Sequence, residues 1–418
     1  MTRDEIAGEP KAGEARRRAL CLLVAHTFPP LLGGSAAVYE ALARHANGAI
    51  AVLTSRRDHR TGEERPGWRE ADRSVPYAVH RLDLVRPPLG GRLSATLAWA
   101  PRATLLAASV ARLARRHGVS AVCVCDDETV GWLVPFVRRA MGLRALVYCH
   151  GDDLVQTDPR AVARRSRHLA AAHAVVAASA FAARRLEAAY GVPRDRIVLL
   201  PNGVDLDRFC PGPPDGALAA ALGMVGRRVI LAATRLVPRK GVDRLIAALP
   251  AVLARVPNAA LLIAGEGPQR PALEAQVQGL PVRFLGAVPP ERMPALHRLA
   301  EVVVLPNREE PGEVDGIPMT VLEAQACGRP VIGGRAGGTP EAIADGETGL
   351  VVDGEDTFAI AAAVIRVLTD HALAARLAAG ALAVSSSRDW RARTRSFLDL
   401  CTASAKGSAQ PPPAASRD

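Results

Sequence analysis

The sequence predicts an α/β protein with two domains, each built on a doubly wound parallel sheet. Short apolar runs alternate with amphipathic segments of helical period along most of the chain, which is typical of parallel strands joined by helices. The 418 residues suffice for two domains that each have their own core. A segment rich in proline and glycine, PGPPDG at 211–216, lies between the two series of runs and indicates a linker.

The first half of the chain is expected to contain buried strands separated by helices. Its first apolar run is unbroken, which is the pattern of a parallel strand buried on both faces. We expect the helix after this strand to be capped at Ser35, the polar stretch that ends near Pro76 to be a surface excursion, and Pro101 to begin a helix. The predicted strands are 19–25, 50–53, 121–125, 144–149, 174–177 and 197–200, and the predicted later helices are 101–117, 130–141, 160–172 and 179–190.

The second half repeats the alternation. Gly241 is expected to begin a helix with an apolar inner face, and Gly328 and Pro330 to end the helix MTVLEAQAC. The predicted strands are 228–233, 260–264, 282–285, 302–305, 331–332 and 349–352, and the other predicted helices are 268–278, 356–368, 371–383 and 390–400.

Composition and charge exclude several classes of protein. Apolar residues make up 49% and charged residues 23% of the chain, as in soluble globular proteins, and no run approaches the ~20 apolar residues of a membrane span. The first 18 residues are charged and lack the apolar core of a signal peptide, so we expect a cytoplasmic protein. The seven cysteines show no paired spacing of a zinc site, which favours buried reduced thiols.

The net charge of +11 raises the question of an anionic partner. Nucleic acid is not favoured, because the basic clusters lack interleaved aromatic residues and zinc-finger spacing. The clusters lie on predicted helices at 112–117, 138–139 and 164–168. They are either a solvated face or a surface that attracts an anionic membrane or a polyprenyl-phosphate or phospholipid acceptor.

The most informative stretch is 306–341, PNREEPGEVDGIPMTVLEAQACGRPVIGGRAGGTPE. Pro318 stands at the first position of a predicted helix, whose free N–H groups and dipole form an anion site. Asp315 and Glu323 are eight residues apart, so in a helix they lie on one side, about 12 Å from each other. Two carboxylates at that distance suit hydroxyls at the two ends of a long ligand whose phosphates lie between them, and a nucleotide sugar has this layout.

Three further groups follow predicted strands. Arg235 and Lys240 flank a proline turn before a helix, where two cations form a diphosphate clamp. Gly33 and Gly34 permit close approach of the backbone to a phosphate. His150 directly follows the strand 144–149, at the sheet edge where open α/β sheets bind ligands.

The central stretch resembles the signature of family 4 of the retaining glycosyltransferases, which have the GT-B fold. That signature reads E-G-(F/I)-(G/P)-x-x-x-L-E-A, followed by A-x-G-x-P-V. Glu323 matches its second acid, and Asp315 stands where the family usually has Glu, one methylene longer. The resemblance also covers RLVPRKG at 235–241, GEG at 265–267 and PNGVD at 201–205, which resembles the hinge between the family's domains.

The resemblance implies two Rossmann-like domains that face a cleft, and a role for each matching residue. Glu323 holds the nucleotide ribose, Asp315 and His150 hold the donor sugar, and Arg235 and Lys240 hold the diphosphate. The remaining donor-binding residues implied are Gly33, Gly34, Gly265, Glu266, Gly316, Ile317, Pro318 and Met319. The implied domains are 19–205 and 206–385, with a helix at 386–403 that returns to the first domain; we expect a disordered leader at 1–18 and a disordered tail at 404–418.

The implied activity is transfer of a hexosyl unit, with retained configuration, from a UDP- or GDP-linked sugar to a glycan or lipid-linked acceptor. No cofactor and no metal ion are implied, and we interpret Asp152 and Asp153 as acceptor-loop or surface charge. Polysaccharide or glycolipid biosynthesis, in the cytoplasm or at the inner face of the membrane, is the expected setting.

Other functions remain open at this point. A different GT-B enzyme, such as a nucleotide-sugar 2-epimerase or a phosphorylase, is disfavoured by the Arg235/Lys240 and Asp315/Glu323 pairs and by the lack of a pyridoxal-type lysine motif. A sugar-nucleotide-binding protein without catalysis would explain the change to Asp315. A basic adaptor at a membrane surface would explain the charge. The sequence leaves the donor base, the sugar and the acceptor undetermined.

Overall fold

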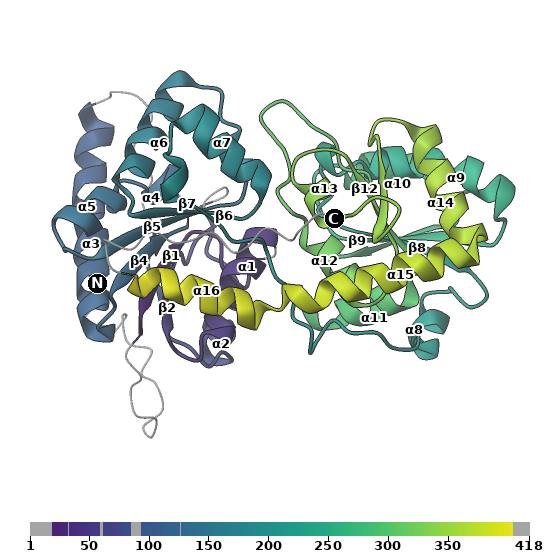
Figure 1. The fold of residues 1–418 in the computed structure, drawn as a ribbon, viewed down its shortest axis with the longest axis horizontal. Coiled ribbons are helices and arrows are strands. Elements are labelled where there is room, and N and C mark those ends of the chain that lie inside the picture. The colour runs from purple at the N-terminus through teal and green to yellow at the C-terminus, as the bar shows by residue number, and fades with distance from the viewer. Residues whose placement is uncertain (1–18, 32, 59–61, 85–92, 126, 404–418) are drawn as a thin grey trace. The chain divides into compact units, whose positions relative to one another are not determined.

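A computed structural model describes residues 19–403, apart from residues 32, 59–61, 85–92 and 126. The described chain divides into two compact units, each with its own parallel sheet (Figure 1). One unit takes the chain up to Pro201 and again from Trp390, and the other comprises Asn202–Asp389. The predicted leader and tail lie outside the described residues.

The sheet of the first unit has seven parallel strands in the order β3-β2-β1-β4-β5-β6-β7. The central strands are buried along their whole length, because their apolar runs meet helices on both faces. The strands are β1 (Cys21–Ala25), β2 (Ile50–Thr54), β3 (Val79–Arg81), β4 (Ala121–Val124), β5 (Arg144–Cys149), β6 (Ala174–Ala177) and β7 (Ile197–Leu199). The helices are α1 (Gly34–His45), α2 (Trp68–Arg73), α3 (Leu93–His117), α4 (Asp127–Val130), α5 (Leu133–Arg139), α6 (Pro159–Ala171), α7 (Ala180–Tyr190) and α16 (Trp390–Thr402).

Helix α16 completes the first unit although it follows the second unit in the chain. Its apolar side chains Trp390 and Phe397 are buried, and the ring of Phe397 lies 6.3 Å from that of Tyr148 on β5. The guanidinium of Arg144 donates a hydrogen bond of 2.9 Å to the backbone carbonyl of Ala403. The C-terminal segment is therefore part of the core that surrounds β5.

The sheet of the second unit has six parallel strands in the order β10-β9-β8-β11-β12-β13. The strands are β8 (Arg228–Ala233), β9 (Ala259–Ala264), β10 (Val282–Gly286), β11 (Val302–Leu305), β12 (Val331–Gly334) and β13 (Gly349–Val352). The helices are α8 (Gly216–Ala221), α9 (Val242–Arg255), α10 (Arg270–Gln276), α11 (Met293–Leu299), α12 (Met319–Ala326), α13 (Thr339–Ala342), α14 (Thr357–Thr369) and α15 (His371–Ser385). Both sheets confirm the predicted fold class of two doubly wound, Rossmann-like domains.

The strand order reverses once in each sheet, between β1 and β4 and between β8 and β11. The loops that leave the carboxyl ends of two such strands run to opposite faces of the sheet, and ligands of open α/β sheets bind between them. The loops after β8 and β11, together with helix α12, carry most of the residues selected from the sequence.

Two local predictions were wrong. Pro101 lies inside α3, which begins at Leu93: a proline removes one backbone donor, and the upstream residues contain no other helix breaker. Ser35 does not cap α1, because the helix begins at Gly34 and its cap position is Gly33. The polar stretch after β2 contains the short helix α2, none of whose residues is buried, which agrees with the predicted surface excursion.

Among the described residues, no single helix is long and apolar enough to cross a membrane. One pair of segments, Thr357–Thr369 and His371–Arg388, passes that test together by length and composition, with a bend of 96° between them.

Candidate functional site

Three charged side chains meet where the loops after β8 and β11 approach each other. Asp315 Oδ1 lies 2.9 Å from Nε of Arg239 and 2.8 Å from Nζ of Lys240. A second acid, Glu313, pairs with Nη1 of the same arginine at 2.8 Å. The side chains of Arg239, Lys240 and Asp315 are only 7%, 13% and 6% exposed, so these ion pairs are largely screened from water.

Gly241 allows the two loops to come this close. It ends the short 3-10 turn Pro238–Lys240 in the left-handed region, with a φ of 66°, and a Cβ atom there would lie 2.0 Å from the carbonyl oxygen of Pro306. The backbone N–H of Arg308 donates to the carbonyl of Arg239 at 2.9 Å and joins the loops a second time. Glycine is thus required directly after Lys240, because a side chain there would block this contact.

The electrostatics of Asp315 favour its ionised form. Burial by itself raises the pKa of this carboxyl, but the charges and hydrogen bonds of Lys240 and Arg239 outweigh it and hold the pKa below its ordinary value. Its second oxygen, Oδ2, is buried and accepts no hydrogen bond among the described residues. The carboxylate therefore keeps one acceptor available for a ligand hydroxyl.

Helix α12 begins at Met319, and the segment that leads into it from Asp315 is fixed from two sides. The side-chain amide of Asn202 donates to the carbonyl of Ile317 at 3.2 Å, and the N–H of Gly338 donates to the carbonyl of Asp315 at 3.0 Å. Pro318 occupies the cap position, and no side chain caps the first N–H groups of the helix. An anion site needs uncapped donors of this kind, and the anion site predicted at this helix start stays a prediction.

Glu323 lies further along α12. Its side chain is 18% exposed, and its Oε2 atom lies 3.5 Å from Nε2 of His297 on α11. His297 is fully buried and packs its ring against Phe209 at 5.9 Å. Of the predicted pair of acids, α12 carries only Glu323. Asp315 lies before the cap residue Pro318, so the two acids do not share a helix as their spacing predicted.

The loop after β9 lies against the loop after β8. A Cβ atom at Gly265, whose φ is 145°, would lie 1.8 Å from the carbonyl oxygen of Thr234. Glu266 pairs with Arg270 one turn into the following segment and is 48% exposed. Arg235 begins the loop after β8 and is exposed, unlike Arg239. The backbone at 265–267 is therefore fixed by packing.

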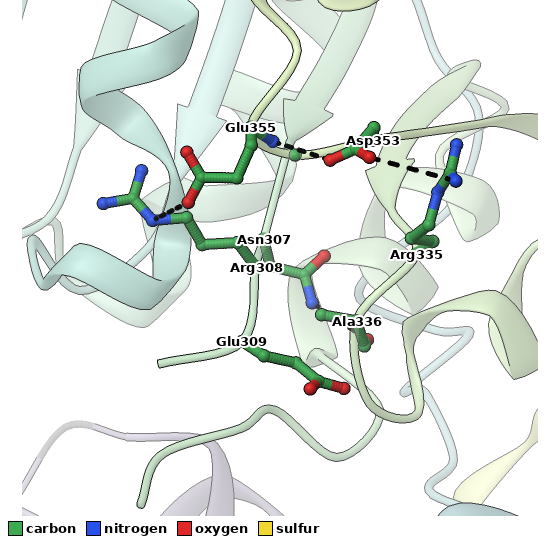
Figure 2. A pocket seen from close by; sticks show the side chains of 8 residues that line it. Asn307, Arg308, Glu309, Arg335, Ala336, Asp353 and Glu355 are labelled. Carbon is green, nitrogen blue, oxygen red and sulfur yellow. Dashed lines mark hydrogen bonds and ion pairs between the residues drawn. The ribbon is translucent and has the colours of Figure 1, made fainter. Parts of the chain in front are cut away.

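A pocket of about 420 Å³ opens at the same sheet edge, at the ends of β11, β12 and β13 (Figure 2). Within it, Arg308 pairs with Glu355 at 3.0 Å, and Arg335 approaches Asp353 at 3.9 Å. The residues that line it are Asn307, Arg308, Glu309, Arg335, Ala336, Asp353, Gly354 and Glu355, none of which was selected from the sequence.

In the first unit, His150 follows β5 and is partly buried. Its Nε2 atom lies 2.8 Å from the hydroxyl of Tyr39 on α1. The carboxylate of Asp153 accepts hydrogen bonds from the backbone N–H groups of His150 and Gly151 at 3.1 and 2.7 Å. The loop that carries the histidine is therefore fixed by a side chain of the Asp152–Asp153 pair.

Gly33 and Gly34 form the exposed start of α1. Neither glycine has a neighbouring atom that an added Cβ would meet, so packing within the described chain does not require glycine here. Their predicted contact with a phosphate stays a prediction.

Sequence reasoning missed two members of the charged cluster, Arg239 and Glu313. Arg239 was passed over because Arg235 matched the family spacing, yet Arg239 is the arginine that contacts Asp315. The available signal was local. Arg239 and Lys240 lie together in a one-turn segment between a proline and a glycine, so their side chains start close to each other.

The chain matches the sequence models of two protein families. The one described as Glycosyltransferase Family 4 matches residues 32–208, and the one described as Glycosyl transferases group 1 matches residues 227–370. The matches cover both units, and the second contains every residue of the charged cluster.

Individual proteins are similar over most of the chain. The chain is 35% identical over 392 residues to a GDP-mannose-dependent alpha-(1-6)-phosphatidylinositol monomannoside mannosyltransferase of Mycolicibacterium smegmatis, covering 91% of this chain and 97% of that protein. A D-inositol 3-phosphate glycosyltransferase of Nocardia farcinica is 33% identical over 291 residues, 65% of this chain and 62% of that protein. A crystal structure of an Anabaena protein in complex with UDP and glucose has a TM-score of 0.73 at 19% identity, covering 91% of this chain and 98% of that one, which shows a shared fold.

Proposed function

Since the chain belongs to glycosyltransferase family 4 and has the GT-B fold, we propose that it transfers a mannosyl unit from GDP-mannose to a phosphatidylinositol mannoside, with retained configuration. The observation that carries the proposal is the buried cluster of Lys240, Arg239 and Asp315 before the free start of α12. The donor and acceptor are taken from the printed name of the M. smegmatis relative, which this chain matches over nearly its full length. The Nocardia relative, whose name also contains an inositol phosphate, supports the acceptor class.

Donor binding is proposed to occupy the loops after β8 and β11 and the start of α12. As the bond from the anomeric carbon to the diphosphate breaks, negative charge grows on the departing oxygens. Arg235, Lys240 and the N–H groups at the start of α12 (Gly316, Ile317 and Met319, with Pro318 between them) stabilise that charge. Glu323 accepts from the ribose hydroxyls, and the loop of Gly265 and Glu266 lies beside the nucleotide.

The sugar is proposed to bind through Asp315, and a contact of His150 with the sugar stays a prediction. The free Oδ2 of Asp315 accepts a sugar hydroxyl while Oδ1 stays with Arg239. No carboxylate acts as a nucleophile: the acceptor hydroxyl attacks from the face that the diphosphate leaves and gives its proton to a departing phosphate oxygen. This route retains the configuration and uses no metal ion.

The lipid acceptor implies work at a membrane, and we place the reaction at its cytoplasmic face. Exposed arginines of the first unit support this: Arg112, Arg115 and Arg116 on α3, Arg138 and Arg139 on α5, and Arg160 and Arg167 on α6. Such a surface attracts anionic phospholipids. Cosedimentation with vesicles of anionic phospholipid that weakens with salt would support this placement, and cosedimentation equal to that with neutral vesicles would count against it.

The decisive experiment measures nucleotide binding and turnover with the same preparations. GDP and GDP-mannose should raise the melting temperature more than UDP, ADP or their sugar conjugates, and Lys240→Ala and Glu323→Ala should each remove most of that rise. Arg228→Ala is the matched control, because it deletes a cation paired with Glu301 at the amino end of β8, the opposite edge of the sheet. Mannosyl transfer from GDP-mannose to a phosphatidylinositol monomannoside should survive EDTA.

Each part of the proposal fails on a distinct result. Selective stabilisation by UDP would overturn the donor, stabilisation without transfer to any lipid acceptor would indicate a binding protein, and loss of transfer in EDTA would overturn metal independence.

A further inference from the structure

The imidazole of His150 belongs to a chain of hydrogen bonds that ends on the backbone. The hydroxyl of Tyr39 donates to the carbonyl oxygen of Cys125 at 2.7 Å, and the same hydroxyl oxygen lies 2.8 Å from Nε2 of His150. Tyr39 is 1% exposed, and Cys125 is buried directly after β4. The tyrosine and the carbonyl that accepts its proton are therefore both fixed in the core.

The number of protons available in this series of hydrogen bonds decides which ring nitrogen of His150 is protonated. A tyrosine hydroxyl has one proton, which Tyr39 gives to the carbonyl of Cys125. If Nε2 of His150 carried a lone pair instead of a proton, two acceptors would face each other at 2.8 Å. Only a histidine that is protonated at Nε2 satisfies both hydrogen bonds.

Burial also favours the neutral form of the ring. Burial lowers the pKa of His150, and this effect exceeds the opposite effect of the carboxylates of Asp153 and Asp152. A neutral imidazole with its proton on Nε2 has a lone pair on Nδ1, and Nδ1 has no hydrogen-bond partner among the described residues. The free nitrogen is thus an acceptor.

We propose that Tyr39 is a positioning residue that holds His150 in the Nε2–H tautomer, so that Nδ1 accepts a hydrogen bond from a hydroxyl of the sugar. The ligand rests on the proposed function, but the tautomer does not. A hydroxyl can donate to this nitrogen, whereas a phosphate oxygen or a carbonyl cannot, so the tautomer directs His150 toward the sugar and away from the diphosphate.

The neighbourhood provides a matched control. Tyr148, on β5, places its ring 5.0 Å from the imidazole of His150 and 5.8 Å from the ring of Tyr39. Its hydroxyl is buried and has no hydrogen-bond partner among the residues that the structure describes. Tyr148→Phe therefore removes a buried hydroxyl beside the same histidine without touching the hydrogen-bond chain, and Tyr39→Phe removes the link.

The test is nitrogen NMR of the full chain labelled with ¹⁵N-histidine at pH 7.5, without ligand. The resonances of His150, one of ten histidines, are assigned by their loss in His150→Gln. We expect the pattern of a neutral Nε2–H ring in the wild type and in Tyr148→Phe, and an average of the two tautomers in Tyr39→Phe. A wild-type ring protonated at Nδ1, a wild-type imidazolium, or an unchanged pattern in Tyr39→Phe would each overturn the proposal.

Kinetics then separates positioning from the proposed activity. With GDP-mannose, Tyr39→Phe should lower kcat/KM about tenfold, the usual effect of one lost hydrogen bond to a neutral group, and Tyr148→Phe should leave it within about twofold. The NMR result stands even if the chain transfers no mannose, so failure of the tautomer and failure of the proposed function are distinguishable. Should Tyr39→Phe not fold, the wild-type spectrum alone decides.

Discussion

Asp315 is one methylene shorter than the glutamate of the family signature, and two neighbouring cations pair with it. The shorter acid ends close to its own backbone, and its Oδ1 is met by two cations of the loop after β8, Arg239 and Lys240. Lys240 is thus held beside the carboxylate, and Arg239 also pairs with Glu313. We interpret Asp315 as an anchor of the cations as well as a sugar ligand.

Asp315→Asn should destabilise the second unit by about 3 kcal/mol, because it leaves two buried cations without their carboxylate. The pKa of Asp315 is lower in the folded chain than in the unfolded chain, so its contribution is complete above about pH 4 and disappears as the pH falls through the folded pKa. The variant should therefore lose less stability than the wild type between pH 5 and pH 2, as measured by urea unfolding across that range (about three pH units).

If the wild type and Asp315→Asn lost the same free energy of unfolding between pH 5 and pH 2, this account of Asp315 would be contradicted. Asp315→Glu tests the same site by length: an enzyme whose cations fit the short acid should lose turnover, whereas gained turnover would indicate a degenerate site that the longer acid repairs.

At the scale of elements, the site depends on the contact between the loops after β8 and β11. Gly241 turns the chain from the cation-bearing segment into α9, and it does so against the backbone of Pro306. This residue must therefore adopt a left-handed φ and must also lack a side chain. The distance between Lys240 and Asp315 is therefore set by backbone packing between two loops.

Gly241→Ala should cost the second unit more than 2 kcal/mol and abolish stabilisation by GDP, since its Cβ would lie 2.0 Å from the carbonyl oxygen of Pro306 and push the loops apart. Gly226→Ala is the control: its φ of 72° is similar, but no atom lies within 4 Å of the added Cβ. That variant should lose only about 1 kcal/mol and keep GDP binding. Equal losses of unfolding free energy in the two variants would show that the left-handed conformation, and not the contact with Pro306, requires glycine at 241.

At the scale of the whole molecule, the first unit needs the last helix of the chain. The core face of α16 includes Trp390, Phe397 and Cys401, each at most 2% exposed, and Ser120 donates to the carbonyl of Cys401 at 3.2 Å. The first unit is therefore completed only after the second has been synthesised.

Deletion of residues 390–418 should expose the side of β4 and β5 that α16 covers, including Tyr148, and so destabilise the first unit selectively. Hydrogen exchange should accelerate in peptides from 121–125 and 144–149 and stay slow in 228–233 and 259–264. Deletion of 404–418 alone is the control and should change neither set. Equal acceleration in both units would show that the two unfold together.

The sequence by itself determined the fold class, most strands and the residues of the family motifs. The strands of 21–25 and 302–305 are unbroken apolar runs, and their burial on both faces follows from that local pattern. The glycine after Lys240 is also a local signal and holds in the structure, whereas the predicted helical spacing of Asp315 and Glu323 does not, because Asp315 lies before the helix. The prediction failed at Pro101, where the helix continues through a proline, because a proline removes only one backbone donor and the helix residues before it include no other helix breaker.

Only the tertiary structure decided which charged groups meet. Arg239 and Asp315 are 76 residues apart, and their contact follows from the strand order that makes β8 and β11 neighbours. The same holds for Tyr39, Cys125 and His150, which lie on α1, after β4 and after β5 and are joined through one hydroxyl. Local residue patterns specify elements, whereas the pairing of strands sets which loop ends share an edge, and the chemistry of both sites depends on that pairing.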